Sequence, residues 1–71
     1  MAKAAREMLE RALRAPGSPQ VIMEQARGML KAEIELSRME GASPEYLQEW
    51  EELLTMLETY GPQRTLQMLT Q

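Results

Sequence analysis

The amino-acid sequence predicts an all-α protein built on an antiparallel helical hairpin, with helices over about residues 19–40 and 44–60. An extra N-terminal helix over about 2–15 and a short C-terminal helical turn complete the expected fold. Two segments, "APGSPQ" and "EGASPE", separate long stretches in which apolar side chains recur at helical spacing. Only residues 41–43 join the two longer helices, and so short a connection allows little except an antiparallel arrangement. The chain has 71 residues and is one small domain, of a size whose core contributes only about 3–5 kcal/mol.

Serine, proline and glycine mark the ends of these helices. Ser18 and Ser43 are placed as N-caps, where a hydroxyl accepts a hydrogen bond from an otherwise unpaired backbone N–H. Each is followed by a proline at the first helical position, where a missing N–H costs nothing. Gly41 and Gly61 are suited to helix C-termini, and Pro62 prevents the second of these helices from continuing unbroken.

The helix over 2–15 has one apolar face and several charged side chains elsewhere. Glu10 precedes Arg14 by four residues, the order that favours an ion pair, and Glu7 precedes Arg11 in the same way. The apolar face consists of Ala5, Met8, Leu9, Ala12 and Leu13.

The helix over 19–40 carries two apolar stripes. The first repeats every seven residues, as in a coiled-coil seam, and consists of Ile22, Met29 and Leu36 with Gln25, Ala32 and Met39. The second lies beside it and consists of Met23, Ala26, Leu30 and Ile34. Together the stripes cover more than half of the circumference, so a single neighbouring helix cannot cover both. Gly28 and Ala32 are small enough to let another helix approach closely.

The helix over 44–60 supplies the aromatic residues, and its seam consists of Tyr46, Trp50, Leu53, Leu57 and Tyr60. We expect this seam to face the first stripe of 19–40, so that the hairpin seam on that side consists of Ile22, Met29, Ala32, Leu36 and Met39. The second stripe then needs another cover, either the helix over 2–15 or a partner protein or second copy. The candidate partner-binding residues are therefore Met23, Ala26, Leu30 and Ile34, with the flanking Leu47 and Leu54.

The composition leaves little for catalysis or cofactor binding. The chain has no His, Cys or Asp, which commonly act as base, nucleophile or orienting acid. Glu45, Glu49 and Glu52 share one helix face, but carboxylates alone on a helix form only a weak site for a hard cation. Ser37 has no candidate base except Glu33, which we expect at the edge of the apolar arc, reaching solvent or pairing with an arginine of 2–15. We therefore expect no enzyme activity, no cofactor, no metal site and no small-molecule substrate.

The charge is distributed unevenly along the chain, whose net charge is −3. Residues 1–38 hold seven Lys and Arg and five Glu, a balance of +2, whereas 39–71 hold one Arg and six Glu, a balance of −5. An acidic C-terminal half repels nucleic-acid phosphates and lipid headgroups alike. No run of residues is long and apolar enough to span a membrane. We expect a cytoplasmic protein that binds neither nucleic acid nor membrane.

The join between the two longer helices resembles a known family. In "ELSRMEGASPEYLQEWEELLTMLE", the matching residues are a basic residue, a glycine, a small residue, a proline, an acid and a tyrosine: Arg38, Gly41, Ala42, Pro44, Glu45 and Tyr46. Over about residues 20–60 the chain is similar to the small co-chaperones of bacterial type III secretion needle subunits, the YscE/PscE family. Its arginine-rich first helix and its helix end at Gly61 depart from that family's pattern. The resemblance implies a two-helix hairpin that binds a helical-repeat co-chaperone, the pair holding the needle subunit unpolymerised in the cytoplasm.

Two other functions fit the same residues. A small acidic inhibitor or antitoxin-like protein of phage or plasmid type would use the glutamates of 44–60 against a basic target. A structural homo-oligomer would join two hairpins into a four-helix bundle through the stripe that contains Leu30. All three functions make the chain a helical protein-interaction module whose partner is a protein.

Overall fold

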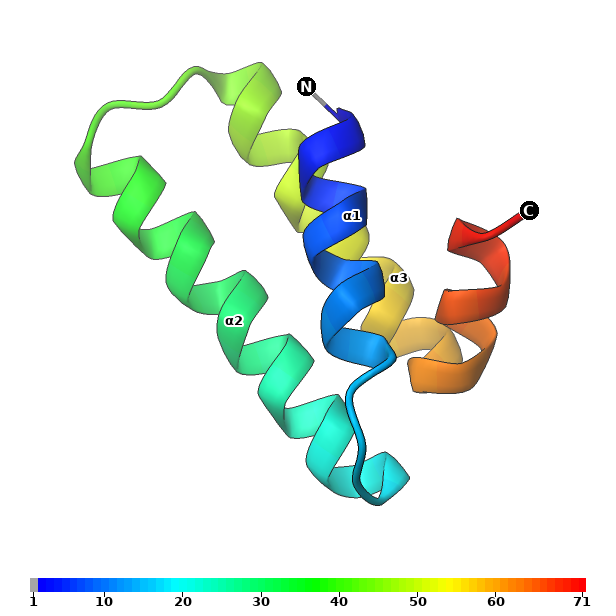
Figure 1. Ribbon diagram of the computed structural model, residues 1–71. Coiled ribbons are helices and arrows are strands. Elements are labelled where there is room, and N and C mark those ends of the chain that lie inside the picture. The colour runs from blue at the N-terminus through cyan, green and yellow to red at the C-terminus, as the bar shows by residue number, and fades with distance from the viewer. Residues whose placement is uncertain (1) are drawn as a thin grey trace.

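The protein is all-helical, as the sequence predicts. A computed structural model describes residues 2–71, and this part of the chain consists of α1 (Ala2–Leu13), α2 (Pro19–Met39) and α3 (Pro44–Leu69) (Figure 1). The described residues contain no strand. Helices α2 and α3 form the antiparallel hairpin, and α1 folds back to contact both of them. The expected fold class is confirmed.

Both predicted N-caps are present. Ser18 Oγ accepts a hydrogen bond from the backbone N–H of Val21 at 3.3 Å, and α2 begins at the next residue. Ser43 Oγ accepts one from the backbone N–H of Tyr46 at 3.2 Å, and α3 begins in the same way. These bonds satisfy donors that the first helical turn would otherwise leave unpaired.

The turn between α2 and α3 depends on Gly41, whose φ of 81° lies in the left-handed region that favours glycine. The backbone N–H of Ala42 donates to the carbonyl of Ser37 at 2.9 Å, and that of Gly41 donates to the carbonyl of Arg38 at 3.2 Å. This pair of bonds is a Schellman motif, which satisfies the last carbonyls of a helix and reverses the chain. The predicted helix end at Gly41 is confirmed.

A second glycine divides α3. Gly61 has φ 83° and ψ 173°, so the helical backbone is interrupted there, and Pro62 starts a further two turns that end at Leu69. Figure 1 shows this last segment, orange to red, turning back beside the longer part of α3 that precedes Gly61. Thr65 in this segment is fully buried, and its hydroxyl donates to the carbonyl of Met56 at 3.3 Å. The C-terminal helical turn expected from sequence is therefore part of the folded core.

All three helices contribute to one hydrophobic core. Leu9, Leu30 and Leu57, one from each helix, are fully buried at its centre. The other buried apolar residues are Ala5, Leu13, Ala26, Ile34, Trp50, Leu53 and Leu69. The ring of Trp50 lies 6.1 Å from that of Tyr46, measured between centroids, in a tilted arrangement.

Candidate interaction surface

The structure reverses the expected roles of the two stripes on α2. Ala26, Leu30 and Ile34, proposed from sequence as partner-binding residues, lie inside the protein's own core. Leu36 and Met39, placed from sequence in the hairpin seam, are 53% and 80% exposed. The assignment of these two sets was wrong, and of the alternatives for covering the second stripe, α1 is the one realised.

The volumes of the side chains explain the reversal. Two members of the first stripe, Gln25 and Ala32, bury little apolar area, whereas in the second stripe only Ala26 is small. Because stabilisation grows with the apolar area removed from water, a core shared with α1 and α3 favours the second stripe. Ala32 is consequently exposed, while Ile22, Met23 and Met29 are half-buried against the core from its margins.

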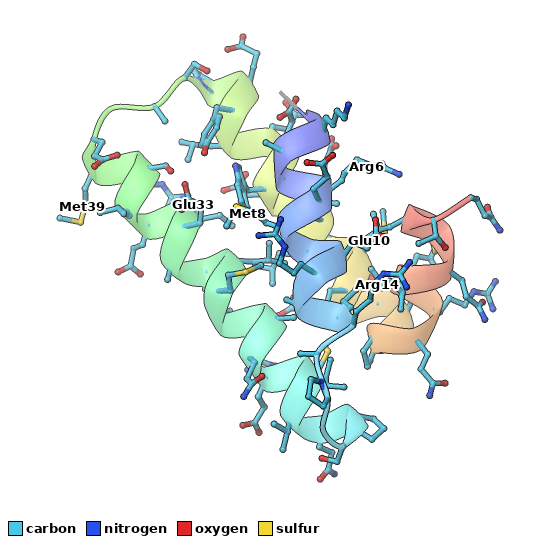
Figure 2. All side chains as sticks on the ribbon, in the orientation of Figure 1. Arg6, Met8, Glu10, Arg14, Glu33 and Met39 are labelled. Atoms are coloured by element: carbon cyan, nitrogen blue, oxygen red, sulfur yellow. The ribbon has the colours of Figure 1, made fainter. Side chains whose placement is uncertain are left out.

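The exposed side of α2 forms a surface of uncharged residues, which we call the outer face, with the exposed Glu35 directly at its margin. It consists of Val21, Gln25, Gly28, Ala32, Leu36 and Met39, all of them exposed. Val21 and Met39 are each nine residues from Leu30, which at about 100° per residue places them on the side opposite the core. Figure 2 shows Met39 pointing away from α1 and α3. Of the five large apolar residues exposed in the described part of the chain, three belong to this face, so the exposure is concentrated on one helix.

Two different edges border the outer face. One edge, the charged edge, consists of Glu24, Lys31 and Arg38, spaced seven residues apart. The other, the apolar edge, consists of Ile22, Met29 and Leu36, with Leu36 shared with the outer face. Arg38 also pairs with Glu51 of α3 at 3.0 Å, whereas no ion pair within residues 2–71 involves Glu24 or Lys31.

The seam predicted on α3 is largely found in the core. Trp50, Leu53 and Leu57 are buried, and Tyr46 is half-buried against them. Tyr60 is the exception, with 49% of its surface exposed. It lies immediately before the break at Gly61, and the Arg64 guanidinium lies 5.8 Å from its ring centroid. Leu47 and Leu54 are half-buried, and Leu54 packs against the core.

A polar cluster fastens α2 to α3 near their turn. One carboxylate oxygen of Glu33 accepts hydrogen bonds from Ser37 Oγ at 2.9 Å and from Tyr46 Oη at 3.0 Å. Of the two sequence-based expectations for Glu33, pairing with an arginine of α1 was wrong, because the carboxylate of this half-buried residue is bound by Ser37 and Tyr46. The tyrosine was missed, although Glu33 lies eight residues before Gly41 and Tyr46 five residues after it, and a hairpin can bring such positions together. A pocket of about 380 Å³ opens beside this cluster.

The glutamates of α3 are partly engaged within the molecule. Glu51 pairs with Arg38, and Glu58 lies 3.9 Å from Arg27, so two ion pairs link α2 and α3.

Within residues 2–71, no three acidic side chains come close enough together to suggest a metal site. In the same part of the chain, no helix has the length and apolar character that crossing a membrane requires.

No family model, curated protein or solved structure matches this chain. The resemblance of residues 20–60 to the needle co-chaperones therefore stays a prediction.

Proposed function

We propose that this chain is a non-enzymatic interaction module that binds another α-helix through the outer face of α2. One observation carries the proposal: Val21, Leu36 and Met39 are about half to four-fifths exposed on one side of a single helix, where Glu35 is the nearest charged residue. A helix in a monomer normally presents charged and polar residues on the side opposite its core. Apolar side chains at spacings of three and four residues along such a side form the surface that a second helix packs against.

The form of the surface supports a helix as the ligand. It follows all 21 residues of α2, which at 1.5 Å per residue is a length of about 30 Å. Gly28 and Ala32 have small side chains, so a second helix can approach the middle of the surface closely. Among residues 2–71, no side chain beyond those of its two chain neighbours lies within 4 Å of a Cβ added at Gly28. Met39 at one end adds a flexible apolar side chain that adapts to different partners.

Site-specific photocrosslinking tests the proposal. Benzoylphenylalanine replaces Leu36 on the outer face in one variant and Thr55, an exposed residue of α3, in the matched control. In cells of the source organism, position 36 is expected to crosslink to one discrete protein, which can be a second copy, and position 55 is not. Adding Met39→Glu should abolish the crosslink from position 36. Equal crosslinking from both positions, or none from position 36, would overturn the proposal.

Within this class of function, the specific partner system we propose is that of a cytoplasmic type III secretion needle co-chaperone. The support is the resemblance at the turn, where Arg38, Gly41 and Tyr46 stand at the matching positions, together with the antiparallel hairpin. The third helix adds a feature that the family's two-helix hairpin lacks. Co-expression with a needle subunit and its helical-repeat co-chaperone should give a soluble ternary complex, lost on Leu36→Glu. A needle subunit that polymerises equally with and without this chain would eliminate this partner system.

The acidic inhibitor is the less favoured alternative. Glu51 and Glu58 are engaged with Arg38 and Arg27, so part of the negative charge of α3 is neutralised within the molecule. Reversing the exposed Glu45 and Glu52 to lysine distinguishes the two functions. An inhibitor would lose its target, whereas crosslinking from position 36 should be unchanged.

A further inference from the structure

We infer that the outer face of α2 binds the same face of a second copy of this chain in antiparallel orientation. The two-fold axis passes through this face at the level of Leu30 and Lys31 along the helix. The inference rests on the proposed function, because it assumes that the outer face is an interface, and it adds the partner's identity and direction. Two α2 helices related in this way bring together outer-face positions that are equally far from Leu30. On the two edges, which are offset by one residue along the helix, the pairing centres are Lys31 for the charged edge and Met29 for the apolar edge. Three heptads are available, since α2 has 21 residues.

The outer face is complementary to itself in this register. Val21 and Met39 are each nine residues from Leu30, so each end of the face joins a valine to the methionine of the second copy. Gly28 and Ala32 are each two residues from Leu30 and meet across the axis, where two small side chains let the backbones approach. Glu35, adjacent to the outer face, comes opposite Gln25 of the second copy, whose amide can donate to the carboxylate.

The charged edge decides the direction of the two helices. In an antiparallel pair each edge meets the same edge of the other helix, whereas in a parallel pair it meets the opposite edge. Glu24 and Arg38 are each seven residues from Lys31, so the antiparallel pair sets Glu24 against Arg38 of the second copy, twice by symmetry. Arg38 already pairs with Glu51 of its own chain through Nη2, and its other N–H groups are the donors for Glu24. The parallel pair would set these charged side chains against the apolar edge.

The apolar edge agrees with the same direction. In the antiparallel pair, Met29 meets Met29 of the second copy and Ile22 meets Leu36 of the second copy, so apolar side chains meet only apolar side chains. The one unfavourable contact is between Lys31 and Lys31 of the second copy at the axis. Because both copies use the same patch, the interface is isologous and closes at two chains rather than growing into a filament.

Disulfide trapping tests the direction. The chain has no cysteine, so Val21→Cys and Met39→Cys each introduce a single thiol. Equimolar mixing of the two variants under glutathione-buffered oxidation should give mainly the mixed disulfide, well above the statistical half, as read by intact mass. Homodisulfides in excess would show a parallel pair and would overturn the inference.

Light scattering on the full chain tests the second copy itself. The wild type is expected to be a dimer at high concentration, Ala32→Glu a monomer with unchanged helical circular dichroism, and the control Thr55→Glu a dimer. Lys31→Gln removes the like-charge contact at the axis and should lower the dimer Kd about two- to fivefold, the size expected for an exposed charge pair. No change, or weaker association, in Lys31→Gln would contradict this register.

The outcomes separate this inference from the proposed function. A wild type that stays monomeric while position 36 crosslinks to a different protein overturns the second copy and leaves the interaction surface standing. A monomer with no crosslink from position 36 overturns both. A dimer that Ala32→Glu leaves intact uses another face and also overturns the inference.

Discussion

The hydroxyl of Tyr46 donates a hydrogen bond to the carboxylate of Glu33 at 3.0 Å, across the turn that joins α2 to α3. Ser37 donates to the same oxygen, so one glutamate receives a donor from each helix of the hairpin. The Glu33 carboxylate lies within the apolar arc of α2, and these two hydrogen bonds satisfy it and link α2 to α3.

Tyr46→Phe tests this fastening by removing the hydroxyl and leaving the ring against Trp50. Hydrogen bonds to charged groups contribute about 1.5–3 kcal/mol when buried, and because the Glu33 site is only half-buried we expect a loss of about 1 kcal/mol. The urea midpoint should fall with an unchanged m-value. The exposed Tyr60→Phe is the control, and a loss of equal size there would show that the bond to Glu33 contributes nothing.

Leu30→Ala and Leu36→Ala test which stripe of α2 lies in the core. Leu30 is fully buried, and deleting such a side chain costs about 2–5 kcal/mol, which is comparable to the entire stability of a domain this small. We therefore expect Leu30→Ala to be largely unfolded at 25 °C by circular dichroism. Leu36→Ala, measured at low concentration, should change the unfolding free energy by less than about 0.5 kcal/mol. The reverse order of effects would restore the hairpin seam expected from sequence.

Gly61→Ala and Gly28→Ala form a matched pair of glycine substitutions. Gly61 has φ 83° and ψ 173°, a region essentially restricted to glycine, so alanine there should cost about 1–3 kcal/mol. Gly28 is an exposed helical residue with open space around it, so alanine should stabilise the isolated chain by up to about 1 kcal/mol. Thermal melts at low concentration give both values. Opposite signs are expected, and a tolerated Gly61→Ala would mean that the break in α3 does not require glycine.

Thr65→Val tests the bond between the last segment and α3. Valine keeps the shape of the buried threonine but cannot donate to the Met56 carbonyl, so we expect a loss of about 1 kcal/mol. For a domain of this size that loss lowers Tm by about 4–8 °C. Thr55→Val, at an exposed position of α3, should leave Tm nearly unchanged. Equal Tm values for the two variants would refute the role of the hydroxyl.

Trp50→Phe tests a weak point of the core. Trp50 is 3% exposed, and its indole N–H has no hydrogen-bond partner among residues 2–71. Phenylalanine removes this unpaired donor, which offsets part of the lost apolar area, so the substitution should cost less than about 1.5 kcal/mol. Trp50→Ala should cost about 3–5 kcal/mol. Urea denaturation followed by circular dichroism compares the two variants, and similar large losses would argue against any relief from the unpaired N–H.

The parts of the fold that depend on neighbouring residues could be predicted from sequence. Ser18 and Ser43 cap their helices, and Gly41 ends α2, because each acts through bonds to residues only a few positions away. The same reasoning placed the break at Gly61. Such features are determined before any helix meets another.

The orientation of α2 about its own axis could not be predicted in the same way. Both stripes are apolar, and the choice between Leu30 and Leu36 as the buried residue depends on α1 covering the hairpin. That contact joins segments far apart in the chain and leaves no local pattern. The candidate surface was misplaced for this reason, although the need for two covers on α2 was anticipated correctly.

The break at Gly61 also divides the chain into parts that can open separately. Pro62 has no backbone N–H and Gly61 is not helical, so the hydrogen-bond ladder of α3 is weakened between its long segment and its last two turns. Residues 63–69 are held by Thr65 and Leu69, which are buried, and by Leu66, which is half-buried against the core. Their amides should exchange with solvent deuterium faster than those around Leu57, because opening the last two turns leaves the longer helices packed. We therefore expect local unfolding of this protein to begin in the last two turns of α3.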